Sequence, residues 1–135
     1  LNKEMVERAE GVVREFFAED YAPMLIHGDL HHFNVLTSGR GWLAIDPKGV
    51  IGPAAYEVGP LLINPWNDLG RQGEILRLTA KRIAILSERL GFERERVRDW
   101  GLAHAVLSAW WSLEDNAAWE YALNFAGLLA RTKLN

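Results

Sequence analysis

The amino-acid sequence predicts an α+β fold that is mainly α-helical and contains a small β-hairpin. Apolar residues recur at helical spacing near the N-terminus and through the second half of the chain. Two short apolar runs on either side of residues 38–41 instead have the pattern of paired strands. With 135 residues, of which 49% are hydrophobic, the chain can bury one core, so we expect a single domain over residues 1–135.

The first predicted helix runs from Asn2 to about Glu19. Apolar residues return there every three or four positions, so one face should pack on the core, and Pro23 limits the helix at its C-terminal end. The apolar residues are Met5, Ala9, Val12, Val13, Phe16 and Phe17.

The hairpin is predicted between Val35 and Ile45. Its two apolar runs flank a Ser-Gly-Arg-Gly turn at residues 38–41, and these residue types favour a tight reversal. Because a hairpin returns the chain to its starting edge, Asp46 should lie close to the residues that precede Val35.

Glycines and prolines interrupt the chain between Gly49 and Pro65, so we expect a loop there, with at most one helical turn before the apolar segment 61–63. Three helices should follow, and Gly91 should cap the first of them. We expect the six tryptophans to lie mainly in the core, with Trp66 as the one placed to be exposed in a loop. The helical stripes are Ile75, Leu76, Thr79, Ile83, Leu86 and Leu90; then Val97, Trp100, Ala103, Val106, Leu107 and Trp110; then Trp119, Leu123, Ala126 and Leu129.

A polar motif, His-Gly-Asp-Leu-His-His-Phe-Asn, occupies residues 27–34, just before the hairpin. Moving a phosphoryl group from ATP to an alcohol requires a carboxylate near the attacking hydroxyl and oxygen ligands for Mg²⁺. Asp29 and Asn34 have the spacing of the catalytic-loop Asp and the metal-binding Asn of kinases, and Asp46 follows twelve positions after Asn34. The spacing therefore predicts Asp29 as the catalytic residue and Asn34 and Asp46 as Mg²⁺ ligands.

Each of these three residues also has a structural alternative. Asp29 could form a turn, Asn34 could bond the backbone of its own loop, and Asp46 could simply end a strand. Turn formation does not explain why all three stand at these distances, so the pattern favours phosphoryl transfer.

The motif of residues 27–34, followed by an Asp, resembles the Brenner-type motif of aminoglycoside phosphotransferases. The run Gly-Trp-Leu-Ala-Ile-Asp-Pro-Lys-Gly at 41–49, then Tyr56-Glu57 and Asn64-Pro65, resembles one branch, the aminoglycoside/hydroxyurea antibiotic resistance kinases, which include streptomycin 6-kinases. The resemblance implies a protein-kinase-like C-terminal lobe whose hairpin carries the catalytic and metal loops. It also implies ATP and Mg²⁺ as cofactors and a small-molecule hydroxyl as acceptor, with a cationic aminoglycoside such as streptomycin as the leading substrate.

That family builds its N-terminal lobe from a Gly-rich phosphate loop and a Val-Ala-x-Lys strand. Neither pattern occurs in this sequence, which begins at Leu1 without an initiator Met. We therefore expect residues 1–135 to be the C-terminal lobe of a longer kinase, without the ATP-binding N-terminal lobe, and to be inactive alone.

The four histidines receive different interpretations. His27, which follows an apolar pair, should support the loop, as it does in the resembled kinases. His31 could donate to the γ-phosphate of bound ATP or be structural, and both stay open. His32 and His104 are interpreted as structural or surface groups.

Three acids are candidates for binding a cationic substrate. Glu57 could contact it, or could tie nearby backbone amides. Glu114 and Asp115 could form an acidic patch, which the resembled family builds largely from its C-terminal helices, or could simply end a helix.

Composition excludes several other classes of protein. A net charge of −3 offers no broad basic surface for nucleic acid or anionic lipid. Cysteine is absent, and no apolar run has the length of a membrane span, so we expect a cytoplasmic protein without disulfides. Absence of the N-terminal lobe should expose apolar surface and favour self-association.

Two rival functions remain. A transition-metal hydrolase site could be formed by His27, Asp29, His31, His32 and Asp46, because imidazole and carboxylate suit zinc or manganese. This alternative leaves Asn34 without a role. Alternatively, the Trp-rich helices could form a non-catalytic binding or dimerisation module.

Overall fold

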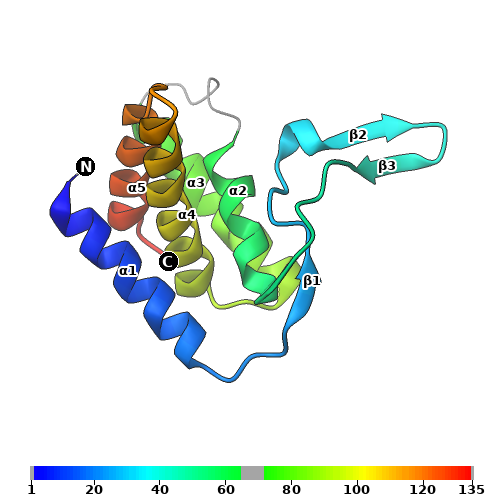
Figure 1. Cartoon of the computed structure of the whole chain (residues 1–135), viewed down its shortest axis with the longest axis horizontal. Helices are drawn as coiled ribbons and strands as arrows, with labels where there is room; N and C mark the ends of the chain where they lie inside the picture. The colour runs from blue at the N-terminus through cyan, green and yellow to red at the C-terminus, as the bar shows by residue number, and fades with distance from the viewer. Residues whose placement is uncertain (1, 65–71, 135) are drawn as a thin grey trace.

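The computed structural model describes residues 2–64 and 72–134, which form a body of helices with a β-region on one side (Figure 1). The helices are α1 (Lys3–Ala18), α2 (Val58–Ile63), α3 (Gln72–Leu90), α4 (Arg94–Glu114) and α5 (Glu120–Arg131). The strands are β1 (Met24–Ile26), β2 (Val35–Ser38), β3 (Gly41–Ala44) and β4 (Val50–Gly52). The mainly helical α+β prediction is therefore confirmed.

Helix α4 is the centre of the helical body, because α1, α2, α3 and α5 all pack against it. Its Trp100 is only 2% exposed, and the ring of Phe16 from α1 lies 5.0 Å from the Trp100 ring, centroid to centroid. Leu62 of α2 and Leu129 of α5 are fully buried in the same core. The core thus joins elements from both ends of the sequence.

Helix α2 lies directly on α4. A Cβ atom added to Gly59 would stand 2.6 Å from the Cβ of His104, so the two helices approach as closely as they do because position 59 has no side chain. Arg82 of α3 fixes the other end of α2 by donating to the carbonyls of Leu61, Leu62 and Asn64. These carbonyls would otherwise lack partners at the helix C-terminus.

The β-region consists of two separate two-stranded antiparallel sheets. Strands β2 and β3 form the predicted hairpin, with Val35 paired to Ala44 and Ser38 to Gly41. Strands β1 and β4 form the other sheet, with Ile26 paired to Val50. The hairpin projects away from the helical body, and the two chain segments between the sheets carry the polar motif and Asp46 (Figure 1).

The predicted loop over 49–65 is wrong for its described part. It contains β4, a 3₁₀-helix at Ala54–Glu57 and then α2. Pro60 sits in the first turn of α2, where its missing N–H is not needed, and Val58 and Leu62 are completely buried. Tertiary packing therefore makes a helix of a segment whose local composition favours a loop.

The expectation that most tryptophans are in the core is also wrong. Of those in the described residues, only Trp100 is buried, whereas Trp42 is 74%, Trp110 49% and Trp111 47% exposed, and Trp119 is half-buried. A helical stripe wider than the contact area leaves its outer residues at the surface. Trp66 lies outside the described residues.

The other helix predictions hold. Helix α1 begins after Asn2, whose side chain accepts from Glu4 N at 3.0 Å, and Gly91 ends α3 with a left-handed φ of 73°. None of the helices in residues 2–64 and 72–134 is long and apolar enough to cross a membrane.

Candidate functional site

The motif loop, residues 27–34, follows β1 and is fixed by short contacts to the segment after β3. His27 Nε2 lies 2.8 Å from Ile45 O, and Lys48 N donates to His27 O at 2.7 Å. Asp29 N donates to His27 Nδ1 at 3.3 Å, so the ring is satisfied by the tautomer that carries its proton on Nε2. Both ring nitrogens of His27 thus contact backbone atoms, and its supporting role in a kinase loop stays a prediction.

Gly28 is the tightest point of this loop. Its φ of 82° lies in the left-handed region, and an added Cβ would stand 3.0 Å from Val50 Cγ2 and 3.3 Å from Lys48 Cβ. Its N–H donates to Glu57 Oε1 at 2.7 Å. The loop is therefore held from β4 on one side and from the start of α2 on the other.

Glu57 is thus placed as a tie to the backbone of the loop, which was the structural alternative for this residue. It ends the 3₁₀-helix directly before α2. A carboxylate that accepts an N–H at this distance makes a strong, charge-assisted hydrogen bond. Contact between Glu57 and a substrate stays a prediction.

Asn34 ends the 3₁₀-turn His32–Asn34 and is buried. Its Nδ2 donates to Asp29 O at 2.9 Å, and its carbonyl accepts from Ile45 N at 2.9 Å. The side-chain nitrogen therefore bonds the loop backbone, whereas a role of the side-chain oxygen as a metal ligand stays a prediction. The backbone-bonding and metal-binding interpretations of Asn34 are compatible, because the amide nitrogen makes the backbone contact and the amide oxygen would bind the metal.

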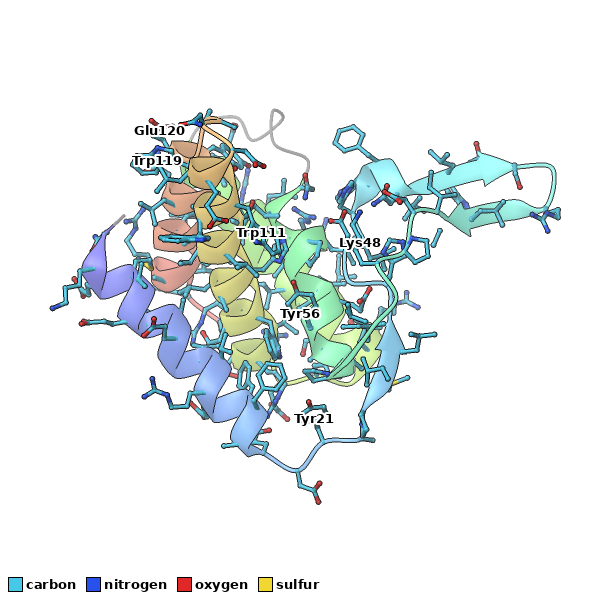
Figure 2. All side chains as sticks on the ribbon, viewed as in Figure 1. Tyr21, Lys48, Tyr56, Trp111, Trp119 and Glu120 are labelled. Carbon is cyan, nitrogen blue, oxygen red and sulfur yellow. The ribbon has the colours of Figure 1, made fainter. Side chains whose placement is uncertain are left out.

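Asp29 and Asp46 share one cation. Lys48 Nζ lies 3.8 Å from Asp29 Oδ2 and 3.4 Å from Asp46 Oδ2, so the hairpin brings the two carboxylates to the same place. Asp46 has a φ of 56°, a left-handed conformation that is uncommon for a residue with a side chain and that clusters at functional sites. Figure 2 shows Lys48 between α2 and the projecting hairpin.

His31 also borders the site. Its Nε2 lies 3.6 Å from Asp29 Oδ1 and 3.3 Å from Asn34 Nδ2, while its Nδ1 accepts from Phe33 N at 3.2 Å. The side chains of Asp29, His31, Asn34, Asp46 and Lys48 therefore form one polar cluster, which we call the loop cluster. A contact between His31 and phosphate remains a prediction.

Tyr56 and His104 form an aromatic layer in the helical body, and both are within electrostatic reach of Asp29. The Tyr56 hydroxyl lies 3.4 Å from His104 Nδ1, and the two rings are edge to face. Burial lowers the pKa of His104 to about 4, although Asp29 acts in the opposite direction, so the ring is neutral near pH 7. Burial, with smaller effects of Asp29 and Glu57, raises the pKa of Tyr56.

An apolar pocket of about 480 Å³ opens on the other side of this layer, between α1 and α4. Tyr56, Trp100 and His104 contribute to its lining, and Glu10 is its charged member. The described residues that line this pocket include no Lys, Arg or Asn, so the loop cluster stays the better candidate for binding a phosphate and a metal ion.

Glu114 and Asp115 are the last residue and the C-cap of α4, and both are exposed. This matches the predicted helix terminus. The described contacts do not connect either carboxylate with the loop cluster, so their role toward a substrate stays a prediction. Trp111, one turn earlier, reaches His104, with ring centroids 6.2 Å apart.

The loop cluster suits Mg²⁺ better than a transition metal. No three His, Cys, Asp or Glu side chains within residues 2–64 and 72–134 are arranged to hold a metal ion, which counts against the hydrolase alternative. Mg²⁺ instead takes one or two carboxylates and completes its shell with waters and substrate phosphates. Asp46 and Asn34 could supply one carboxylate and one amide oxygen for such a site, and their role as Mg²⁺ ligands stays a prediction.

Two groups near the site were not singled out from the sequence. Lys48 could have been found from its position two residues after Asp46. The pairing of Tyr56 with His104 had no sequence signal, because the two residues lie far apart in the chain.

Comparison with known proteins identifies the family of this chain. The sequence model of the aminoglycoside/hydroxyurea antibiotic resistance kinase family matches residues 2–116. The chain is 36% identical to a streptomycin 6-kinase of Streptomyces glaucescens over 95 residues, which are 70% of this chain and 31% of that protein. No solved structure matches the chain at a significant level.

Two further relatives are named for different substrates. A streptomycin 3''-kinase of Klebsiella pneumoniae is 43% identical over 79% of this chain and 41% of its own length. A hydroxyurea phosphotransferase of Kitasatospora aureofaciens is 40% identical over 67% of this chain and 25% of its own length. The chain spans about a third of the length of these curated relatives. It belongs to the aminoglycoside/hydroxyurea antibiotic resistance kinase family, a family of phosphotransferases.

Proposed function

We propose that this chain is the C-terminal, protein-kinase-like lobe of an ATP- and Mg²⁺-dependent phosphotransferase. The reaction transfers the γ-phosphoryl group to a hydroxyl of a small molecule, with a streptomycin-like aminoglycoside as the leading substrate. The observation that carries the proposal is the sharing of Lys48 by Asp29 and Asp46, because it brings a base and a metal ligand to one place. A cytoplasmic location, where ATP and Mg²⁺ are available, is part of the proposal.

Each polar side chain of the loop cluster has a role in this reaction. Asp29 accepts the proton of the attacking hydroxyl or orients it. Asn34 and Asp46 would hold Mg²⁺, which would neutralise charge on the phosphate oxygens. His31, beside Asp29, donates to the phosphate.

Support for an aminoglycoside comes from the relatives and from charge. Two of the relatives are streptomycin kinases, and the net charge of this chain is −3. Glu114 and Asp115 present exposed carboxylates that could pair with the amine or guanidinium groups of such a substrate. The hydroxyurea phosphotransferase makes hydroxyurea the second acceptor to test.

The test is a radiolabelled-ATP transfer assay with streptomycin, other aminoglycosides and hydroxyurea. We expect transfer from a longer protein that joins this chain to an upstream nucleotide-binding lobe, and none from the 135-residue chain alone. Positioning supplies on the order of 7–11 kcal/mol in such reactions, and this chain holds only one side of the nucleotide. Comparable turnover by both proteins would refute the assignment of residues 1–135 as an incomplete lobe.

The role of Asp29 is tested in the same longer protein. We expect Asp29→Asn to lower kcat roughly 10²- to 10⁴-fold and to leave nucleotide affinity nearly unchanged, because the base acts on the acceptor. Asp20→Asn, at an exposed position between α1 and β1, is the matched control. Equal losses of turnover and nucleotide binding in Asp29→Asn would contradict the role as base.

The lobe interface is the part of this proposal that concerns partners. Leu25 and Ile51, on the β1–β4 sheet, are each 76% exposed, and Trp42 on the hairpin is 74% exposed. Apolar surface of this kind favours contact with another protein surface. We expect the isolated chain to self-associate, as judged by sedimentation velocity, and the longer protein to do so less.

A further inference from the structure

The backbone of Lys48 is held by the loop, whereas its side chain is largely exposed to solvent. Its N–H donates to His27 O at 2.7 Å, and its Cβ lies against the backbone of Gly28, where an added Cβ would approach to 3.3 Å. The side chain is nevertheless 52% exposed. The loop therefore determines where the Lys48 side chain starts, whereas solvent and nearby charges determine where its ammonium lies.

The two ion pairs of Lys48 are long and solvent-exposed. At 3.8 Å from Asp29 and 3.4 Å from Asp46, the ammonium makes no short hydrogen bond to either carboxylate. Exposed pairs of this geometry contribute little to stability. Breaking these two ion pairs on ligand binding therefore costs little free energy. The position of the ammonium is better explained by a role in ligand binding than by a contribution to stability.

A cation at this position conflicts with Mg²⁺ at the same carboxylates. Both charges are positive, and repulsion between them rises steeply at separations of a few ångströms. The ammonium therefore leaves Asp46 when the metal is held there. The nearest stable destination is an oxygen of the phosphoryl group that accompanies the metal, because phosphate carries the strongest negative charge in such a site.

The loop region has few other cations for this task. Between residues 27 and 49 the only Lys or Arg side chains in the sequence are Arg40, in the hairpin turn, and Lys48. His31, two positions after Asp29, is the other side chain of the loop cluster that could donate to phosphate. Lys48 therefore supplies the permanent positive charge of the loop cluster.

We propose that Lys48 is a phosphoryl-binding residue, whose ammonium moves from Asp29 and Asp46 to the non-bridging oxygens of the transferred group. This inference rests on the proposed function. In the transfer, the bond between the acceptor oxygen and phosphorus forms and the bond from phosphorus to the ADP oxygen breaks. The electron pair stays on ADP and the hydroxyl proton goes to Asp29. Lys48 keeps its protons and stabilises the negative charge on the phosphoryl oxygens.

Two measurements on Lys48→Met test the proposal, with Lys48→Arg as the charge-conserving variant and Lys81→Met on α3 as an exposed control. In the longer protein, we expect Lys48→Met to lower kcat roughly 10²- to 10³-fold, with the acceptor KM changed less than about threefold. Lys48→Arg should recover part of the loss, and Lys81→Met should match the wild type. A kcat for Lys48→Met within threefold of the wild type would overturn the proposal.

The second measurement needs no turnover and uses the 135-residue chain. Electron paramagnetic resonance should show Mn²⁺ binding Lys48→Met roughly tenfold more tightly than the wild type, because the competing ammonium is gone. Mn²⁺ with tripolyphosphate should bind Lys48→Met more weakly, because the phosphate has lost its partner. These opposite signs are specific to a cation that exchanges carboxylates for phosphate.

The two measurements also separate failure of this inference from failure of the proposed function. If no acceptor is phosphorylated even by the wild-type longer protein, the proposed function fails, and the two binding constants decide the role of Lys48. Equal changes of Mn²⁺ and Mn²⁺-tripolyphosphate affinity, or no change in either, overturn the role. Opposite changes support it.

Discussion

The helical body contains the most buried side chains of the described residues, whereas the β-region carries the side chains that we propose for catalysis. Trp100 in the body is 2% exposed, whereas Trp42 on the hairpin is 74% exposed. The side chains of the loop cluster all lie in or next to the β-region. A tightly packed core allows few substitutions, whereas an exposed loop on a rigid support can present polar groups to a ligand.

Few contacts join the helical body to the β-region, so the loss of any one of them should change the geometry of the loop. A two-stranded sheet is marginally stable by itself, so the motif loop depends on the helical body for its geometry. The body reaches the loop through Glu57, which accepts from Gly28 N. Substitutions in each region, and at this contact, should therefore have different signatures.

The largest effect is expected from a pair of tryptophan substitutions. Trp100→Ala should lower the free energy of unfolding by about 3–5 kcal/mol, because it leaves a cavity at the centre of α4. Trp42→Ala, the same substitution on the hairpin, should change it by less than about 0.5 kcal/mol. Urea denaturation measures both, and similar losses would mean that the two regions share one core.

Acid pH should weaken the body through His104. Its folded pKa of about 4 lies below the usual value of 6.5, so the unfolded chain takes up a proton first as the pH falls. Stability should be fully present above pH 6.5 and fall between pH 6.5 and pH 4, by an amount on the order of 3 kcal/mol from this group.

Chemical denaturation between pH 7 and pH 4, with His104→Gln beside the wild type, isolates this contribution. The variant should show a shallower slope than the wild type over that interval, whatever its stability at pH 7. Parallel slopes would show that other groups, such as carboxylates, account for the acid sensitivity.

Glu57→Gln tests the connection between the regions. The charge-assisted hydrogen bond to Gly28 N should weaken by about 1.5–3 kcal/mol, so we expect kcat of the longer protein to fall roughly 10- to 100-fold through a displaced loop. The KM for streptomycin should change less than about threefold. Glu114→Gln, at a carboxylate that we propose to bind the substrate, is the control. A rise in KM for Glu57→Gln, with kcat unchanged, would instead support a direct contact with the substrate.

The smallest effects are expected from Gly59→Ala and Gly11→Ala, which place the same methyl group in different surroundings. Gly59→Ala should cost about 1–3 kcal/mol of stability, because the new methyl group would collide with His104 and separate α2 from α4. Gly11→Ala on α1, where a Cβ meets nothing within 4 Å, should instead stabilise by about 0.5–1 kcal/mol. Thermal unfolding compares the two, and a neutral Gly59→Ala would contradict the close packing of α2 on α4.

Local patterns predicted the elements whose causes are local. The periodicity of Met5, Ala9 and Phe16 predicted α1, and the turn at residues 38–41 predicted the hairpin. Strand β4 was missed because its partner β1 lies far away in the sequence, and the pairing of Ile26 with Val50 leaves no local trace. Helix α2 was missed because the glycines and prolines near it favour a loop, and only burial against α4 reverses that preference.

The sequence by itself determined which chemical groups are present and, through short-range spacing, that Asp29, Asn34 and Asp46 would lie near one another. That Lys48 stands between the two carboxylates, that Glu57 ties the loop, and that His104 is buried beneath Tyr56 were decided by tertiary structure alone. The physical reason is the distance along the chain over which each effect acts. Spacing and periodicity act over one turn or one hairpin, whereas burial and ion pairing depend on where the whole chain places distant segments.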